Sequence, residues 1–185
     1  MLELGAGLGL PGLTCAHVLG ATSCVMTDGS AAAVARLSEN VKANDNSGSD
    51  KAEDKVGCAV LVTEMQWSEE AGRAVASGLD CDVVIAADVA YPLKDNTCLL
   101  QMFKGMLTPP LSTAGSNEAQ SPASESSASA LQVILAYGWR DIKAGKAFVE
   151  QLAEVASVTE LRRTGEPSIP TILTYLTHLI LIILT

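Results

Sequence analysis

The chain opens with Met1-Leu-Glu-Leu-Gly-Ala-Gly-Leu-Gly-Leu-Pro-Gly12, a short apolar strand that runs into a glycine-rich turn. Glycine tolerates positive φ angles and lets a ligand approach the backbone closely. Pro11 suits the first turn of a following helix, which we expect to continue to about Leu19, with Gly20 as its stop signal. The stretch therefore predicts a strand–turn–helix unit.

The rest of the chain repeats this alternation of apolar runs and helical segments. Alternating strands and helices imply parallel βαβ units. The sequence thus predicts an α/β fold with a Rossmann-like, doubly wound, mostly parallel sheet and a last antiparallel strand. We expect helices over 31–43, 68–77, 93–106 and 142–156, and further strands over 22–27, 56–63, 82–87, 131–137, 157–163 and 169–185.

Composition fits one globular domain over residues 1–185, because 48% of the residues are hydrophobic and 18% are charged. The formal net charge of −9 repels phosphate backbones, so we expect no nucleic-acid partner and favour cationic ones. The five cysteines form no C-x-x-C pair, and with two histidines in the chain we expect no metal site. Reduced thiols and the absence of a basic leader segment predict a cytoplasmic protein, with the nucleus as a further location.

Two segments depart from the α/β pattern. Residues 108–130 are rich in Ser, Ala and Pro, which predicts a disordered insertion rather than a domain boundary. Residues 169–185 form an atypical apolar tail, longer than a final strand needs and short for a membrane span. We expect no membrane partner, and the sequence leaves the oligomeric state open.

The glycine-rich turn alone is compatible with two cofactors. Gly7-Leu-Gly-Leu-Pro-Gly12 matches the G-x-G-x-x-G fingerprint of dinucleotide-binding proteins, and Asp28 follows at the spacing of the ribose-binding acid. The N-terminus of the next helix favours a negative group, which is the pyrophosphate of a dinucleotide or the carboxylate of S-adenosylmethionine. An NAD-dependent oxidoreductase is therefore one hypothesis.

Two further features favour the methyl donor. Glu3 lies inside the first strand, where a carboxylate needs a partner, and the α-ammonium of S-adenosylmethionine would supply one. Asp88-Val-Ala-Tyr91 follows the fourth strand, at the edge of the sheet where α/β proteins bind ligands.

Taken in order, five sequence blocks resemble the methyltransferase-16 family, the seven-strand protein-lysine methyltransferases. The family's last two blocks, an aspartate–tryptophan pair and A-D-V-x-Y, have Gln66-Trp67 and Ala87-Asp-Val-Ala-Tyr91 as their counterparts. The match covers about the first half of the chain and implies a sheet of the class I methyltransferase type. The other three blocks are Leu2 to Gly12, Thr27-Asp-Gly29 and Glu39-Asn-Val-Lys-Ala-Asn44.

The resemblance assigns roles to individual residues. It implies that Asp28 binds the ribose hydroxyls, Gln66 faces the adenine amino group and Trp67 packs on the adenine. Asp88 and Tyr91 are the predicted catalytic residues at the mouth where the methyl group leaves. The remaining residues predicted to bind S-adenosylmethionine are Glu3, Gly5, Gly7, Gly9 and Ala87.

The resemblance thus predicts an S-adenosylmethionine-dependent methyltransferase that modifies a lysine side chain of a protein. A donor-binding pseudoenzyme or interaction module that has lost catalysis is the alternative from another class. Family members usually carry an N-terminal extension before the first strand, and the chain begins at that strand. We therefore expect the sequence to be a fragment or to come from a truncated gene model.

Overall fold

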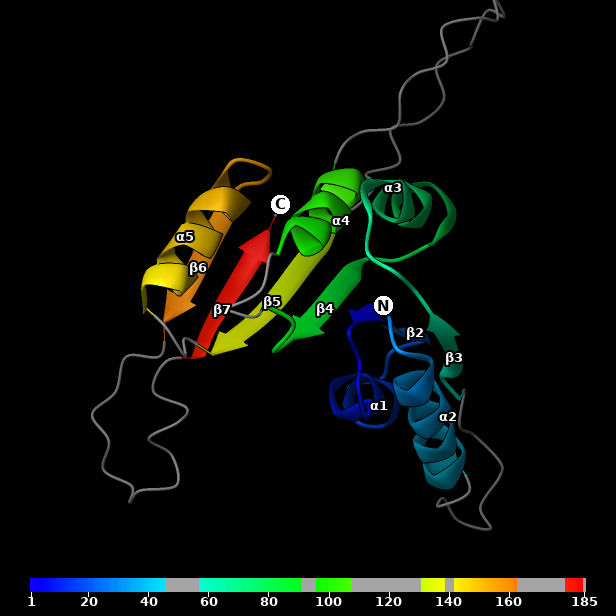
Figure 1. Ribbon diagram of the computed structural model, residues 1–185. Helices are drawn as coiled ribbons and strands as arrows, with labels where there is room; N and C mark the ends of the chain where they lie inside the picture. The colour runs from blue at the N-terminus through cyan, green and yellow to red at the C-terminus, as the bar shows by residue number, and fades with distance from the viewer. Residues whose placement is uncertain (46–56, 91–95, 108–130, 139–141, 163–178, 185) are drawn as a thin grey trace, which may run out of the picture.

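The computed structural model describes residues 1–45, 57–90, 96–107, 131–138, 142–162 and 179–184 (Figure 1). Strands and helices alternate along them, as the sequence predicts. The helices are α1 (Leu10–His17), α2 (Ala31–Asp45), α3 (Glu69–Gly78), α4 (Thr97–Leu107) and α5 (Ile142–Ala153). The strands are β1 (Leu2–Leu4), β2 (Ser23–Asp28), β3 (Ala59–Glu64), β4 (Val83–Ala87), β5 (Gln132–Gly138), β6 (Val158–Arg162) and β7 (Leu179–Leu184).

The strands form one sheet in the order β3-β2-β1-β4-β5-β7-β6. The first five are parallel, which confirms the predicted doubly wound, mostly parallel architecture. The backbone of β7 runs antiparallel between β5 and β6. Strand order reverses between β1 and β4, and this switch point is where open α/β sheets bind ligands.

Each face of the parallel part of the sheet carries its own apolar core. On one face, Leu2 and Leu4 of β1 pack with Phe103 of α4 and Phe148 of α5. On the other, Met26 of β2 packs with side chains of α1 and α2. The single residue of β1 between the two leucines is Glu3, which the strand alternation directs to the second face.

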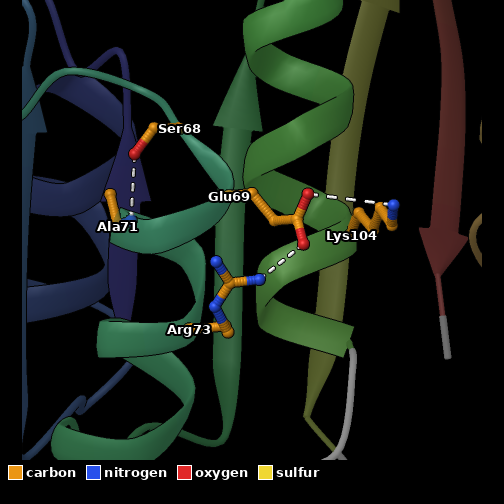
Figure 2. A network of polar contacts seen from close by, with 5 residues as sticks. All are labelled: Ser68, Glu69, Ala71, Arg73 and Lys104. Carbon is orange, nitrogen blue, oxygen red and sulfur yellow. Dashed lines mark hydrogen bonds and ion pairs between the residues drawn. The ribbon is translucent and has the colours of Figure 1, made fainter.

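Helices α3 and α4 cross at very short range. A Cβ at Gly72 would lie 2.2 Å from the carbonyl oxygen of Met102, and one at Gly105 would lie 2.1 Å from that of Glu69. Figure 2 shows Glu69 between the two helices, where its carboxylate pairs with Arg73 of α3 and with Lys104 of α4. The Ser68 side chain caps α3 by accepting a hydrogen bond from the N–H of Ala71 at 3.0 Å.

Several element ends differ from prediction for local reasons. The expected strand over 56–63 begins at Ala59, because Ala59 pairs with Ser23, the first residue of β2. The expected helix over 142–156 ends at Ala153, and residues 154–156 form a hydrogen-bonded turn. The expected insertion over 108–130 and, within the expected tail, residues 169–178 and 185 lie outside the described residues. None of the helices described is both long and apolar enough to cross a membrane.

Candidate methyl-donor site

A cavity of about 390 Å³ opens at the carboxyl ends of the parallel strands. Its walls come from the end of β2, the segments that follow β1, β2, β3 and β4, and the start of α4, so residues far apart in sequence meet at the switch point of the sheet. The volume lies in the range of small-molecule sites. The lining residues are Gly5, Asp28, Gly29, Ser30, Met65, Gln66, Trp67, Asp88, Val89 and Cys98.

The glycine loop has the backbone conformation that the sequence predicts. Gly5, Gly7 and Gly9 have φ angles of 64°, 55° and 83°, in the left-handed region. Close packing adds a second requirement at two of them. A Cβ at Gly5 would lie 2.6 Å from Val89, and one at Gly9 would lie 2.2 Å from Leu37 of α2. Only glycine satisfies both the dihedral angles and the space.

Hydrogen bonds from β2 hold this loop in place. The N–H of Ala6 donates to the carbonyl oxygen of Thr27 at 2.8 Å. The N–H of Gly7 donates to Oδ2 of Asp28 at 3.0 Å. The other oxygen of Asp28 accepts from the N–H of Ser30 at 2.9 Å. Each carboxylate oxygen has a second lone pair, so Asp28 can still accept hydrogen bonds from a ligand in the cavity.

Gln66 and Trp67, which follow β3, both line the cavity. Nε2 of Gln66 donates to the carbonyl oxygen of Gly29 at 2.6 Å, which fixes the orientation of the amide and leaves its oxygen as an acceptor. The six-membered ring of Trp67 lies against Gly5. Its buried Nε1–H has no hydrogen-bond acceptor among the residues described.

Asp88 lines the cavity immediately after β4. Its φ angle of 55° is left-handed, and it is the one such non-glycine residue in the described ranges. Its N–H donates to the carbonyl oxygen of Ala136 at 2.9 Å, so β5 holds the backbone in this conformation. Strained backbone at a cavity wall is typical of functional residues.

Glu3 is placed differently from the other predicted site residues. Its side chain is 2% exposed, and its Oε2 accepts a hydrogen bond from the N–H of Gly12 at 3.0 Å. Burial raises the pKa of this carboxyl to about 7, against the opposing effect of the Gly12 N–H. Glu3 does not line the cavity. Its predicted contact with the donor's ammonium group stays a prediction.

The structure brings together Gly5, Asp28, Gln66, Trp67 and Asp88 on one cavity. Gly7 and Gly9 shape the loop beside it, and Ala87 is the exposed last residue of β4 without lining the cavity. Tyr91 lies outside the described residues. Sequence reasoning missed the other wall residues, although most of them directly neighbour predicted ones: Gly29, Ser30, Met65, Val89 and Cys98.

Comparison with known proteins agrees with this geometry. Residues 1–118 match a protein family described as lysine methyltransferase. The chain belongs to this lysine methyltransferase family. The matched residues carry every wall of the cavity, so the site described above is built entirely within the family's region.

Among curated relatives, the chain is 38% identical over 95 residues to the protein-lysine N-methyltransferase EFM3 of Chaetomium thermophilum. The match covers 49% of this chain and 26% of that protein, so the chain spans about a quarter of the relative's length.

Two solved structures show the same fold. A ribosomal protein L11 methylase from Lactobacillus delbrueckii is 17% identical with a TM-score of 0.50, covering 100% of this chain and 67% of that one. The methyltransferase domain of bacterial-CtHen1-CN is 9% identical with a TM-score of 0.56, covering 100% and 88%. At these identities the likeness concerns the fold alone.

Proposed function

We propose that this chain binds S-adenosylmethionine in the strand-end cavity and transfers its methyl group to a lysine side chain of a protein. One observation carries the proposal. In a chain of the lysine methyltransferase family, the glycine loop, Asp28, Gln66, Trp67 and Asp88 meet on a single cavity.

S-adenosylmethionine is the methyl donor that family and fold imply, and the residues present fit it. A Cβ at Gly7 would meet no described atom within 4 Å, so the loop backbone is open to a ligand there. The Nε1–H of Trp67, which has no acceptor within the described part of the chain, is a buried donor of the kind that a ligand satisfies. The cavity is also large enough for a nucleoside.

The polar atoms of the cavity suit the groups of the donor. Asp28 offers lone pairs on two oxygens, which matches two neighbouring ribose hydroxyls. The amide oxygen of Gln66 accepts from the adenine amino group, as the family's aspartate would, but without its charge. Trp67 supplies an apolar surface for the adenine.

When bound, the donor supplies an electrophilic sulfonium methyl group. The chain's task is to hold the lysine nitrogen in line with it at near-attack distance. Lysine attacks as the neutral amine, and desolvation at the cavity mouth lowers its pKa. Asp88 accepts a hydrogen bond from the amine and so orients its lone pair. Tyr91 stays a predicted partner of the ammonium form through a cation–π contact.

Calorimetric titration tests the donor site. We expect S-adenosylhomocysteine to bind and NAD not to bind. Tight binding of NAD without S-adenosylhomocysteine would instead support the oxidoreductase hypothesis. Transfer of a labelled methyl group to lysine in an extract's proteins tests the activity. Donor binding without any transfer, in this chain and in a longer version of it, would favour the pseudoenzyme.

A further inference from the structure

Helix α2 carries the Glu39-Asn-Val-Lys-Ala-Asn44 block, to which neither the resemblance nor the cavity assigns a role. In the structure, Nδ2 of Asn40 donates a hydrogen bond to the carbonyl oxygen of Leu8 at 2.9 Å. Leu8 lies in the glycine loop, 32 residues earlier in the chain. The motif on α2 therefore contacts the loop directly through a side chain.

The chemistry of this contact fixes the orientation of the amide. A backbone carbonyl is an acceptor only, so the NH₂ group of Asn40 must face it. Asn44, one turn later, donates to the carbonyl oxygen of Asn40 at 2.8 Å within the helix. The two asparagines thus make the same kind of bond, but only that of Asn40 reaches the loop.

The same face of α2 also contacts the loop through an apolar side chain. Leu37, one turn before Asn40, is fully buried and fills the space beside Gly9. The start of α2 is tied to the loop as well, because Asp28 bonds both Ser30 and Gly7. Helix α2 is therefore a brace for the loop along its first three turns.

A glycine loop needs such a brace because its residues have more backbone freedom to lose than any others. The side chain of Leu8 is 63% exposed, so apolar packing does little to hold the loop at this point. A hydrogen bond to the Leu8 carbonyl restricts the loop between Gly7 and Gly9. Restriction before binding lowers the entropic cost of taking a ligand.

We propose that Asn40 is a positioning residue that holds the glycine loop in its donor-binding conformation. It touches neither the cavity nor the reacting atoms. The inference rests on the proposed function for its effect on affinity, but its effect on the loop can be measured without a ligand.

The first experiment is amide hydrogen exchange on the free protein. Gly7 and Gly9 are suitable reporters because both amides donate to described acceptors. Asn40→Asp keeps the side chain's shape and replaces the donor by a carboxylate that repels the carbonyl. We expect exchange at these two amides to become about 3- to 10-fold faster, the size of one hydrogen bond. Asn44→Asp adds the same charge to the same helix and should leave both rates unchanged.

The second experiment is calorimetric titration with S-adenosylhomocysteine. We expect the Kd of Asn40→Asp and Asn40→Ala to rise about 3- to 10-fold, and that of Asn44→Asp to stay at the wild-type value. In steady-state assays the change should lie in KM for the donor rather than in kcat.

The outcomes separate the two proposals. Equal exchange rates at Gly7 and Gly9 in Asn40→Asp and Asn44→Asp would overturn the role of Asn40, whatever the protein binds. Exchange could be faster in Asn40→Asp and unchanged in Asn44→Asp while the wild-type protein fails to bind S-adenosylhomocysteine. That result would uphold the role of Asn40 in holding the loop and overturn the assignment of the donor. Equal losses of affinity in both variants would mean that α2 acts only through overall stability.

Discussion

The carboxylate of Asp28 accepts the N–H of Gly7 at 3.0 Å, and this bond joins the end of β2 to the glycine loop. The same side chain lines the cavity, so it acts on the site in two ways. It holds the loop, and in the proposed function it also presents lone pairs to the donor. These two roles have different consequences when the residue is changed.

Two replacements of Asp28 test its role in holding the loop and its role in binding a ligand. Asp28→Asn keeps an acceptor for one backbone N–H but loses the charge and one acceptor oxygen. Asp28→Ala loses the charge and both acceptor oxygens. We expect the Kd for S-adenosylhomocysteine to rise about 10-fold in the first and about 100-fold in the second, since charge-assisted hydrogen bonds are the stronger ones. Calorimetry measures both values. Asp80→Asn, at an exposed position before β4, is the control, and a Kd for Asp28→Ala equal to that of this control would exclude Asp28 from the site.

Asp88 allows the backbone and the side chain to be tested independently. Its φ of 55° is unfavourable for an alanine and free of strain for glycine. We expect the free energy of unfolding of Asp88→Gly, measured by urea titration, to be about 1 kcal/mol higher than that of Asp88→Ala. Both should lose methyl transfer by about 100-fold, because neither can orient the amine. Full activity in Asp88→Gly would remove the carboxylate from the mechanism while leaving the strain argument intact.

Much of this site follows from the sequence, because its walls are local signals at successive strand ends. Gly5, Asp28 and Asp88 each follow an apolar run, and parallel strands bring such positions to one edge of the sheet. The contact between Asn40 and Leu8 is different. It depends on how α2 packs over the loop, and no local pattern encodes a separation of 32 residues.

Glu3 is a second case in which the sequence indicates a contact but not the group that makes it. The sequence places a carboxylate inside β1 and indicates that it needs a partner. It does not show that the start of α1 supplies one through the N–H of Gly12. That partner depends on where the helix begins and on the close approach of Gly12, whose Cβ would lie 2.4 Å from Oε2 of Glu3.

The raised pKa of Glu3 predicts a pH-dependent stability. The folded state holds the Glu3 proton more tightly than the unfolded state, because the pKa moves from 4.5 to about 7. Its contribution is therefore fully present below about pH 4.5, declines as the pH rises through about 7, and is constant above that. Relative to Glu3→Gln, the wild-type free energy of unfolding should fall by up to about 3 kcal/mol between pH 4.5 and 7. Denaturant titrations across this range measure the difference, and a difference that does not change with pH would contradict the buried, protonated state.

The close crossing of α3 and α4 predicts that replacing two of their glycines by alanine lowers stability, opposite to the usual effect in helices. Replacing glycine by alanine inside a helix normally stabilises it by about 1 kcal/mol. At Gly72 and Gly105 the new Cβ would overlap the backbone of the facing helix, which cannot move aside as a flexible side chain can. We therefore expect Gly72→Ala and Gly105→Ala each to lower the free energy of unfolding by about 1–3 kcal/mol in urea titrations.

Gly78, at the end of α3, has nothing within 4 Å of its Cβ position and provides the matched control. Gly78→Ala should leave stability unchanged or raise it slightly. Because α4 carries Cys98 of the cavity wall, the two destabilising variants should also weaken S-adenosylhomocysteine binding. Wild-type stability in Gly72→Ala would mean that the helices cross at a greater distance than the structure shows.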